Sequence, residues 1–235
     1  AGLPGGGLNI AHEAVDRHVS AGHGAQPALI WLGREGERRV LSYSELAAEA
    51  ARFAHVLQSH AIAPGERVFL LAGRVPALYA ATLGALKAGV VVSPLFAAFG
   101  PEPVRARMEI GQASVLVTTE AHYRRKIADW RTEMPVLKLV LIIGDTAPEG
   151  CVALGPAMAA APDRFETVST APEDVALLHF TSGTTGLPKG VVHVHQAVVA
   201  HAETGRLALD LRPGDIYWCT ADPGWVTGMS YGIIS

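Results

Sequence analysis

An alternation of apolar segments with helix-forming segments dominates residues 67–144. Four runs that are apolar at nearly every position are predicted to form strands: "RVFLLAG" (67–73), "VVVSP" (90–94), "SVLVTT" (114–119) and "VLKLVLIIG" (136–144). Pro76 and Pro101 are each predicted to open a helix between two strands, and a polar helix should run to about Trp130. Strands of this kind fit a parallel sheet covered on both faces. The pattern therefore predicts an α/β fold of stacked, doubly wound, mostly parallel sheets flanked by helices.

The segment before this alternation predicts a small unit of its own. Residues 28–41 are predicted to form two short strands around a polar turn that contains glycine. Ser42 and Glu45 then form a capping box, and apolar residues at helical spacing follow it. We therefore expect a strand pair that leads directly into a helix.

The segment after the alternation predicts a boundary. Residues 145–173 are rich in proline and glycine, so we place a subdomain boundary near residue 170. Two units are expected: a first α/β subdomain over residues 1–170, and the truncated start of a second α/β subdomain over residues 171–235. The second should contain a strand over 174–180, a helix over 195–209 and a strand over 214–219.

Composition excludes several classes of protein. The chain is 49% hydrophobic and 17% charged, which is typical of a globular protein with a sizeable core. Its net charge of -3 gives no basic surface for nucleic acid or an anionic membrane. The N-terminal residues lack the basic and apolar regions of a secretory signal, and no apolar run reaches membrane-spanning length. We therefore expect a cytoplasmic protein with small-molecule partners.

The stretch "HFTSGTTGLPKGV" (179–191) gathers glycines, small hydroxyls and one lysine directly after a predicted strand. Glycines let successive backbone N–H groups point into one concavity suited to phosphate, and hydroxyls add further donors. Lys189, one of only four lysines in the chain, adds a mobile positive charge. It does not open a helix as in a Walker A loop, because Pro188 favours an extended backbone there. A surface linker would explain the glycines but not the lysine. The stretch therefore predicts a holder for a polyphosphate.

This stretch resembles the phosphate-loop signature of the adenylate-forming superfamily, which contains acyl-CoA synthetases, adenylation domains of non-ribosomal peptide synthetases, and luciferases. Three further segments resemble the acetyl-CoA synthetases among them: "LNIAHEAVDRH" (8–18), "LFAAFGPEPVRARM" (95–108) and "GDIYWCTADPGWVTGMSYG" (214–232). The resemblance therefore runs from near residue 8 to residue 235. Many acetyl-CoA synthetases have histidine where this chain has Met229, so the length of the acyl group is left open.

The resemblance implies an ATP-dependent acid–CoA ligase with Mg²⁺ as cofactor. A carboxylate would attack the α-phosphorus of ATP to give an acyl-adenylate and pyrophosphate, and CoA would then form the thioester. The resemblance assigns these residues to the nucleotide phosphates: Thr181, Ser182, Gly183, Thr184, Thr185, Gly186 and Lys189. Among them, Thr184 and Lys189 would support the departure of pyrophosphate.

The resemblance also places an acyl and CoA pocket at Trp225, Val226 and Thr227. A rigid indole there would shorten the pocket and restrict it to small acids, acetate or another short chain. The adenine-binding motif and the C-terminal lid domain of the family are absent from the sequence. We therefore expect the 235 residues alone to be inactive, with at best weak binding of ATP.

Two other functions remain open at this point. The protein could adenylate an acid and load it onto a carrier protein, or it could be a non-catalytic nucleotide-binding module. His193 and His195 are two residues apart on a predicted strand, but further metal ligands do not lie near them in the sequence. We interpret them as a structural pair and predict no protein-held metal site. The sequence leaves the oligomeric state open.

Overall fold

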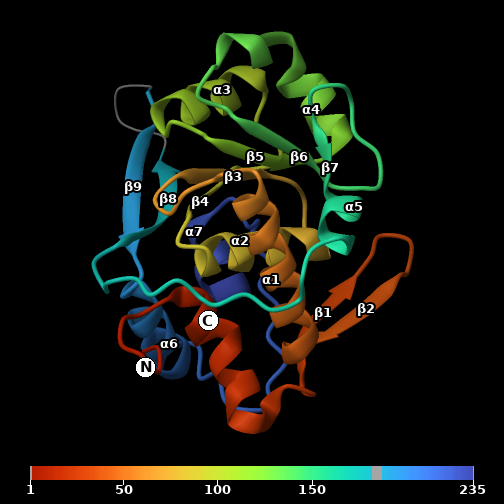
Figure 1. Ribbon diagram of the computed structural model, residues 1–235. Helices are drawn as coiled ribbons and strands as arrows, with labels where there is room; N and C mark the ends of the chain where they lie inside the picture. The colour runs from red at the N-terminus through yellow and green to blue at the C-terminus, as the bar shows by residue number, and fades with distance from the viewer. Residues whose placement is uncertain (1, 182–186, 235) are drawn as a thin grey trace.

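A seven-stranded sheet forms the centre of the computed structural model, which describes residues 2–181 and 187–234 (Figure 1). Its strand order is β7-β6-β5-β3-β4-β8-β9. The strands are β3 (Arg67–Leu71), β4 (Val91–Pro94), β5 (Val115–Thr118), β6 (Leu139–Ile142), β7 (Val152–Ala153), β8 (Val175–Thr181) and β9 (Lys189–Val194). All neighbours pair in parallel except β8 and β9, which are antiparallel. The predicted α/β fold with a mostly parallel sheet is confirmed, and each of the four apolar runs contains a strand.

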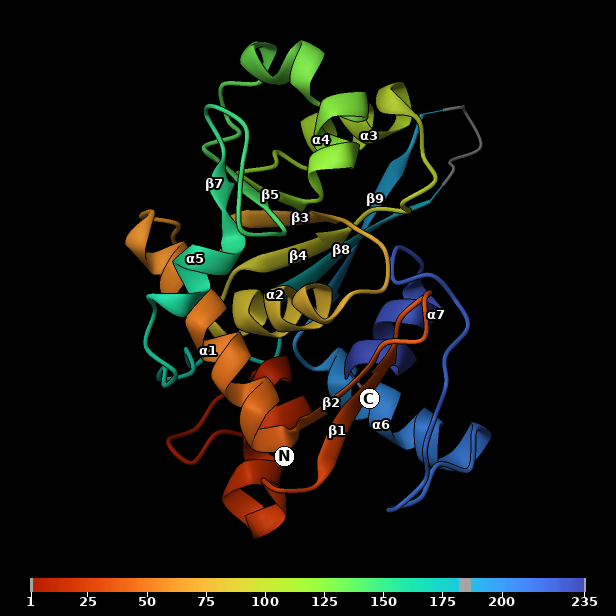
Figure 2. The ribbon, with the colours of Figure 1, turned by 90° about the vertical axis from the view of Figure 1, so that its right-hand side faces the viewer.

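Helices cover both faces of the central strands β3, β4, β5 and β6, which explains why these strands are apolar at nearly every position. On one face lie α1 (Tyr43–Ser59), α2 (Pro76–Lys87) and α5 (Leu154–Ala159), and on the other lie α3 (Pro101–Ile110), α4 (Glu120–Lys126) and the 3₁₀ turn η3 (Ala128–Glu133) (Figures 1 and 2). Alternate residues of β3 enter the two cores. Val68 and Leu70 pack with the α1–α2 layer, whereas Phe69 and Leu71 pack with the α3–α4 layer.

The predicted helix starts are confirmed. Ser42 Oγ accepts a hydrogen bond from the Glu45 backbone N–H at 3.2 Å, and Glu45 Oε2 accepts one from the Ser42 N–H at 2.7 Å. This capping box opens α1 immediately after the hairpin of β1 (Pro27–Leu32) and β2 (Arg38–Ser42). Pro76 and Pro101 each occupy the first position of their helices, where the missing N–H leaves no donor unsatisfied.

The two ends of the chain pack together below the α1–α2 layer (Figure 1). The segments there are the helical turns η1 (His12–Asp16) and η2 (Val19–His23), then α6 (Ala197–Ala208), α7 (Val226–Met229) and η4 (Ser230–Ile234). The Ile10 N–H donates to Nδ1 of buried His195 at 3.1 Å, across 185 residues of sequence. The Asn9 amide group donates to the carbonyls of Leu86 and Val168. These bonds attach the N-terminal segment both to the end of α2 and to the C-terminal third of the described chain.

The predicted strand over residues 214–219 is wrong. The described residues form no strand in this range, and the side chains of Ile216 and Trp218 are each 81% exposed. Alternating apolar residues indicated a strand, but a strand also needs a hydrogen-bonded neighbour, and none of the described strands runs beside this segment. The boundary near residue 170 stays a prediction, and the sheet continues across it because β8 pairs with β4.

Candidate functional site

The proposed phosphate-binding residues lie at the end of the β8–β9 hairpin where the chain passes from one strand to the other. Thr181 is the last residue of β8, Lys189 is the first residue of β9, and the two are paired in the antiparallel register. Both are exposed, so the hydroxyl and the ammonium group are available to a ligand. Five predicted phosphate-binding residues lie outside the described residues: Ser182, Gly183, Thr184, Thr185 and Gly186.

The backbone around Lys189 is extended, as Pro188 predicts. Lys189 begins a strand, so the lysine does not open a helix as it does in a Walker A loop. Gly190 faces Phe180 across the pair, and a Cβ on it would lie 3.0 Å from Leu178 Cδ1. Glycine at this position therefore lets the start of β9 pack closely against β8. The backbone of Lys189 is paired with β8, and its side chain is exposed.

The proposed acyl-binding residues lie on a segment that crosses the carboxyl end of β4. Trp225 directly precedes α7, and its ring centroid lies 5.7 Å from that of Phe96, which follows β4. The Asp222 carboxylate accepts a hydrogen bond from the Gly224 N–H at 2.8 Å, and the Asp222 carbonyl accepts one from the Trp225 N–H at 2.9 Å. This turn presents Trp225, 53% exposed, at the edge of the sheet where α/β folds bind ligands. Val226 and Thr227 are exposed beside it.

Gly224 is required for this close packing. A Cβ at residue 224 would lie 2.5 Å from the Phe96 backbone nitrogen and 2.7 Å from the Leu95 carbonyl carbon. Both contacts are with backbone atoms, so relief needs movement of one whole segment. The contact between the rings of Trp225 and Phe96 therefore requires glycine, which has no side chain, at position 224.

We expect the Gly224→Ala variant to lose about 1 to 3 kcal/mol of unfolding free energy, because the added methyl group overlaps the residue 95–96 backbone. Denaturant unfolding monitored by circular dichroism measures this change. Gly73→Ala is the matched control, because Gly73 also lies in a loop shortly before a helix but a Cβ there meets no atom within 4 Å. Equal losses in the two variants would contradict the packing role of Gly224.

The buried Arg107 and the half-buried Lys126 hold the loop that carries Phe96. The Arg107 guanidinium lies 4.3 Å from the ring centroid of Phe99, and Lys126 Nζ donates to the Ala97 carbonyl at 2.6 Å. Burial lowers the pKa of Arg107, and burial with a smaller contribution from Arg125 lowers the pKa of Lys126. The sequence analysis did not assign these residues to the site. The only local signal was the pair of phenylalanines in "LFAAFG" directly after a strand.

Arg74 attaches the segment before Trp225 to the end of β3. Its Nη2 donates to the Thr220 carbonyl, and its own carbonyl accepts a hydrogen bond from Trp31 Nε1 at 2.7 Å. The two groups of predicted site residues are nevertheless built separately. No hydrogen bond or ring contact between described residues joins Thr181 or Lys189 to Trp225–Thr227.

A histidine cluster joins the β8–β9 hairpin to α6. His179 on β8 is 5.2 Å from His193 on β9, and His193 is 6.4 Å from His201 on α6, measured between ring centroids. Tyr231 closes the row at 6.0 Å from His201. Burial, together with the nearby His193 and His201, lowers the pKa of His179 to about 4, so its ring is neutral at pH 7. Among the described residues, no group of three His, Cys, Asp or Glu side chains is placed to hold a metal ion.

Comparison with known proteins identifies the family. A model of the AMP-binding enzymes matches residues 16–235, which is almost the whole chain. The chain belongs to the AMP-binding enzyme family.

Acetyl-coenzyme A synthetases are among the relatives of this AMP-binding chain. The enzyme of Bacillus subtilis is 40% identical over 233 residues, a match that covers 98% of this chain and 40% of the relative. The enzyme of Chlorobaculum tepidum is 33% identical and is matched over 37% of its length. This chain therefore spans about two fifths of the relatives that it matches.

A solved structure supports the same family. The crystal structure of an acyl-CoA synthetase from Brucella canis superposes with a TM-score of 0.89 at 32% identity, over 100% of this chain and 42% of that one. In the part of the AMP-binding chain that the structure describes, no helix is long and apolar enough to span a bilayer.

Proposed function

We propose that the protein carrying this sequence is an ATP-dependent acid–CoA ligase that activates acetate or another short-chain acid. The observation that carries the proposal is the β8–β9 hairpin, whose paired ends present Thr181 and Lys189 on either side of the signature segment. The family match and the names of the acetyl-coenzyme A synthetase relatives support the reaction class. The cytoplasmic location and the division at residue 170 are parts of the same proposal.

Each group of residues has a separate role in this proposal. Lys189 and the hydroxyls and N–H groups of residues 181–186 would bind the β- and γ-phosphates of ATP and stabilise the charge that develops on pyrophosphate. Mg²⁺, when bound, would neutralise part of that charge.

The acyl end would be shaped by Trp225 and Phe96. Their rings lie at a tilt of 50°, and the turn at Asp222 fixes the indole at the start of α7. A large rigid ring in this position limits the length of acid that fits. Val226 and Thr227 would border the carboxylate and the CoA thiol.

We expect the Lys189→Ala variant of the protein to lose about 10²-fold or more in kcat/KM, because removing one preorganised charge from a developing anion typically costs this much. Acid-dependent exchange of labelled pyrophosphate into ATP measures the first half-reaction, with acetate, propionate and butyrate as substrates. Lys138→Ala is the matched control, because Lys138 is exposed on the surface and paired with Glu66.

The exchange assay separates the proposed function from its alternatives. Absence of exchange with all three acids would contradict the ligase and favour a nucleotide-binding module. Exchange without formation of acyl-CoA would favour an enzyme that loads a carrier protein. Equal activity of Lys189→Ala and Lys138→Ala would contradict the role of Lys189 but not the ligase function.

A further inference from the structure

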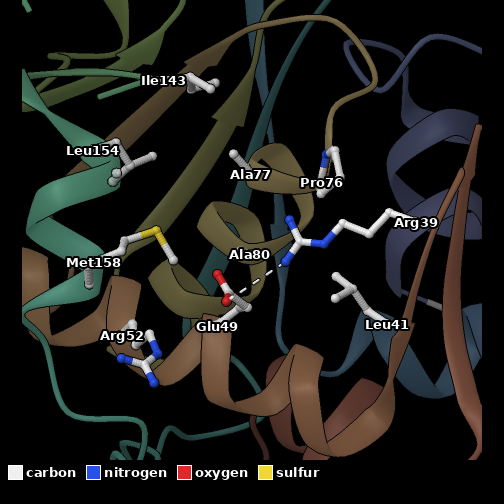
Figure 3. A pocket seen from close by; sticks show the side chains of 13 residues that line it. Arg39, Leu41, Glu49, Arg52, Pro76, Ala77, Ala80, Ile143, Leu154 and Met158 are labelled. Carbon is white, nitrogen blue, oxygen red and sulfur yellow. Dashed lines mark ion pairs between the residues drawn. The ribbon is translucent and has the colours of Figure 1, made fainter. Parts of the chain in front are cut away.

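A cavity of about 360 Å³ lies away from the proposed ATP and acyl site, between β2, α1, α2 and α5 (Figure 3). Its walls include the residues directly after β6, which is separated from β8 in the sheet by β5, β3 and β4. The volume falls in the range of sites that hold small organic molecules. None of the residues assigned above to phosphate or acyl binding lines this cavity.

The charged residues of the cavity carry a net positive charge. Arg39, Glu49 and Arg52 are its charged lining residues, and Figure 3 shows Arg39 and Glu49 pointing toward one another between α1 and α2. The Arg39 Nη2 to Glu49 Oε1 distance is 4.0 Å, at the outer limit of an ion pair. Arg52 Nη1 donates to the Ala161 carbonyl at 2.9 Å, which holds this guanidinium in place. Guanidinium donors are therefore left over for an anion.

The opposite wall of the cavity is apolar. Ile143, Leu154 and Met158 line the side formed by the end of β6 and by α5, and Leu41 lines the side formed by β2 (Figure 3). The start of α5 packs directly against the end of β6, because a Cβ on Gly155 would lie 3.0 Å from the Gly144 carbonyl oxygen. The Arg39 guanidinium thus lies across the cavity from the apolar side chains of Leu154 and Met158 (Figure 3).

We propose that this cavity binds a monocarboxylate with a short apolar body. The carboxylate would bind the Arg39 guanidinium, whose planar pair of N–H donors matches two carboxylate oxygens. The hydrocarbon part would lie against Leu154 and Met158. Two guanidinium groups and one carboxylate favour a single negative charge over the double charge of a phosphate monoester.

The four methionines of the chain provide a direct test. The 235-residue protein labelled with ¹³C at the methionine methyl groups is titrated with hexanoate, and Met158→Leu assigns the signal that reports the cavity. We expect the Met158 methyl signal to shift saturably, and Arg39→Gln to weaken this binding by about tenfold or more. Hexylammonium and inorganic phosphate should leave the signal unchanged at the same concentrations.

The matched control is Arg38→Gln, which removes the same charge from the neighbouring residue on the opposite face of β2. It should leave the affinity for hexanoate unchanged. Met229 lies one helical turn after Trp225, and its N–H donates to the Trp225 carbonyl at 3.0 Å, so its methyl signal serves as a separate reference near the proposed acyl pocket. An unmoved Met158 signal would overturn the inference, and so would an equal shift with hexylammonium or an equal loss in the two arginine variants.

Discussion

Replacing Lys87 with methionine is expected to lower the free energy of unfolding by about 3 to 5 kcal/mol. The Lys87 side chain is only 5% exposed, and its Nζ lies 2.5 Å from Asp16 Oδ2 and 3.0 Å from Thr167 Oγ1. Thr167 also donates to the same Asp16 oxygen at 2.8 Å. Methionine fills a similar volume but leaves the Asp16 carboxylate with one hydroxyl as its partner. The cost is therefore that of a mostly buried charge without its counterion.

Denaturant unfolding of three variants tests this expectation. Arg124→Met is the control, because it breaks an ion pair with Glu120 in which both side chains are largely exposed, and it should cost less than about 1 kcal/mol. Adding Asp16→Leu to Lys87→Met should recover part of the loss, because the unpaired carboxylate is then removed. A Lys87→Met variant as stable as the Arg124→Met variant would refute the buried pair as a stabilising feature.

The free energy of unfolding is expected to fall by about 2 kcal/mol per buried histidine between pH 7 and pH 5. Burial lowers the pKa values of His179 and His195 to about 4. Their ordinary value is 6.5, so the unfolded chain takes up these protons over a pH range in which the folded chain does not. The contribution of these two histidines to the unfolding free energy is therefore fully present above pH 6.5 and is lost as the pH falls toward 4.

His179→Leu isolates one of these contributions. The difference in unfolding free energy between pH 7 and pH 5 should shrink by about 2 kcal/mol in this variant, because the unfolded chain has one fewer site to protonate. His23→Leu is the control, because it makes the same substitution at an exposed histidine. Equal pH dependence in His179→Leu and the unchanged protein would contradict the lowered pKa of His179.

The sheet was predictable because its signals are local. Val68 and Phe69 enter opposite cores, so the four positions of β3 after Arg67 must all be apolar, and this uniformity is visible in the sequence alone. The failure at 214–219 has the opposite cause. The alternation of Ile216 and Trp218 carries no information on whether a neighbouring strand exists, and hydrogen-bonded pairing is a property of the assembled sheet.

The site was predictable where one segment carries it. The glycines, hydroxyls and Lys189 are contiguous in the sequence, whereas Phe96 and Trp225 are brought together by the fold. Arg107 was undetectable as a support for the Phe96 loop, because on the sequence it is one of two arginines on an amphipathic helix. Its contact with Phe99 depends on how α3 packs against the loop before it.

The bond between Ile10 and His195 has a consequence for synthesis on the ribosome. A chain made from its N-terminus can pair β3, β4, β5 and β6 as each emerges, but residues 8–11 have no histidine to bind until some 185 further residues are translated. Such distant contacts form late because of the entropy of closing the loop between them. We therefore expect the N-terminal segment to stay accessible to proteases or chaperones on nascent chains that end before His195, and to become protected once that residue has left the exit tunnel.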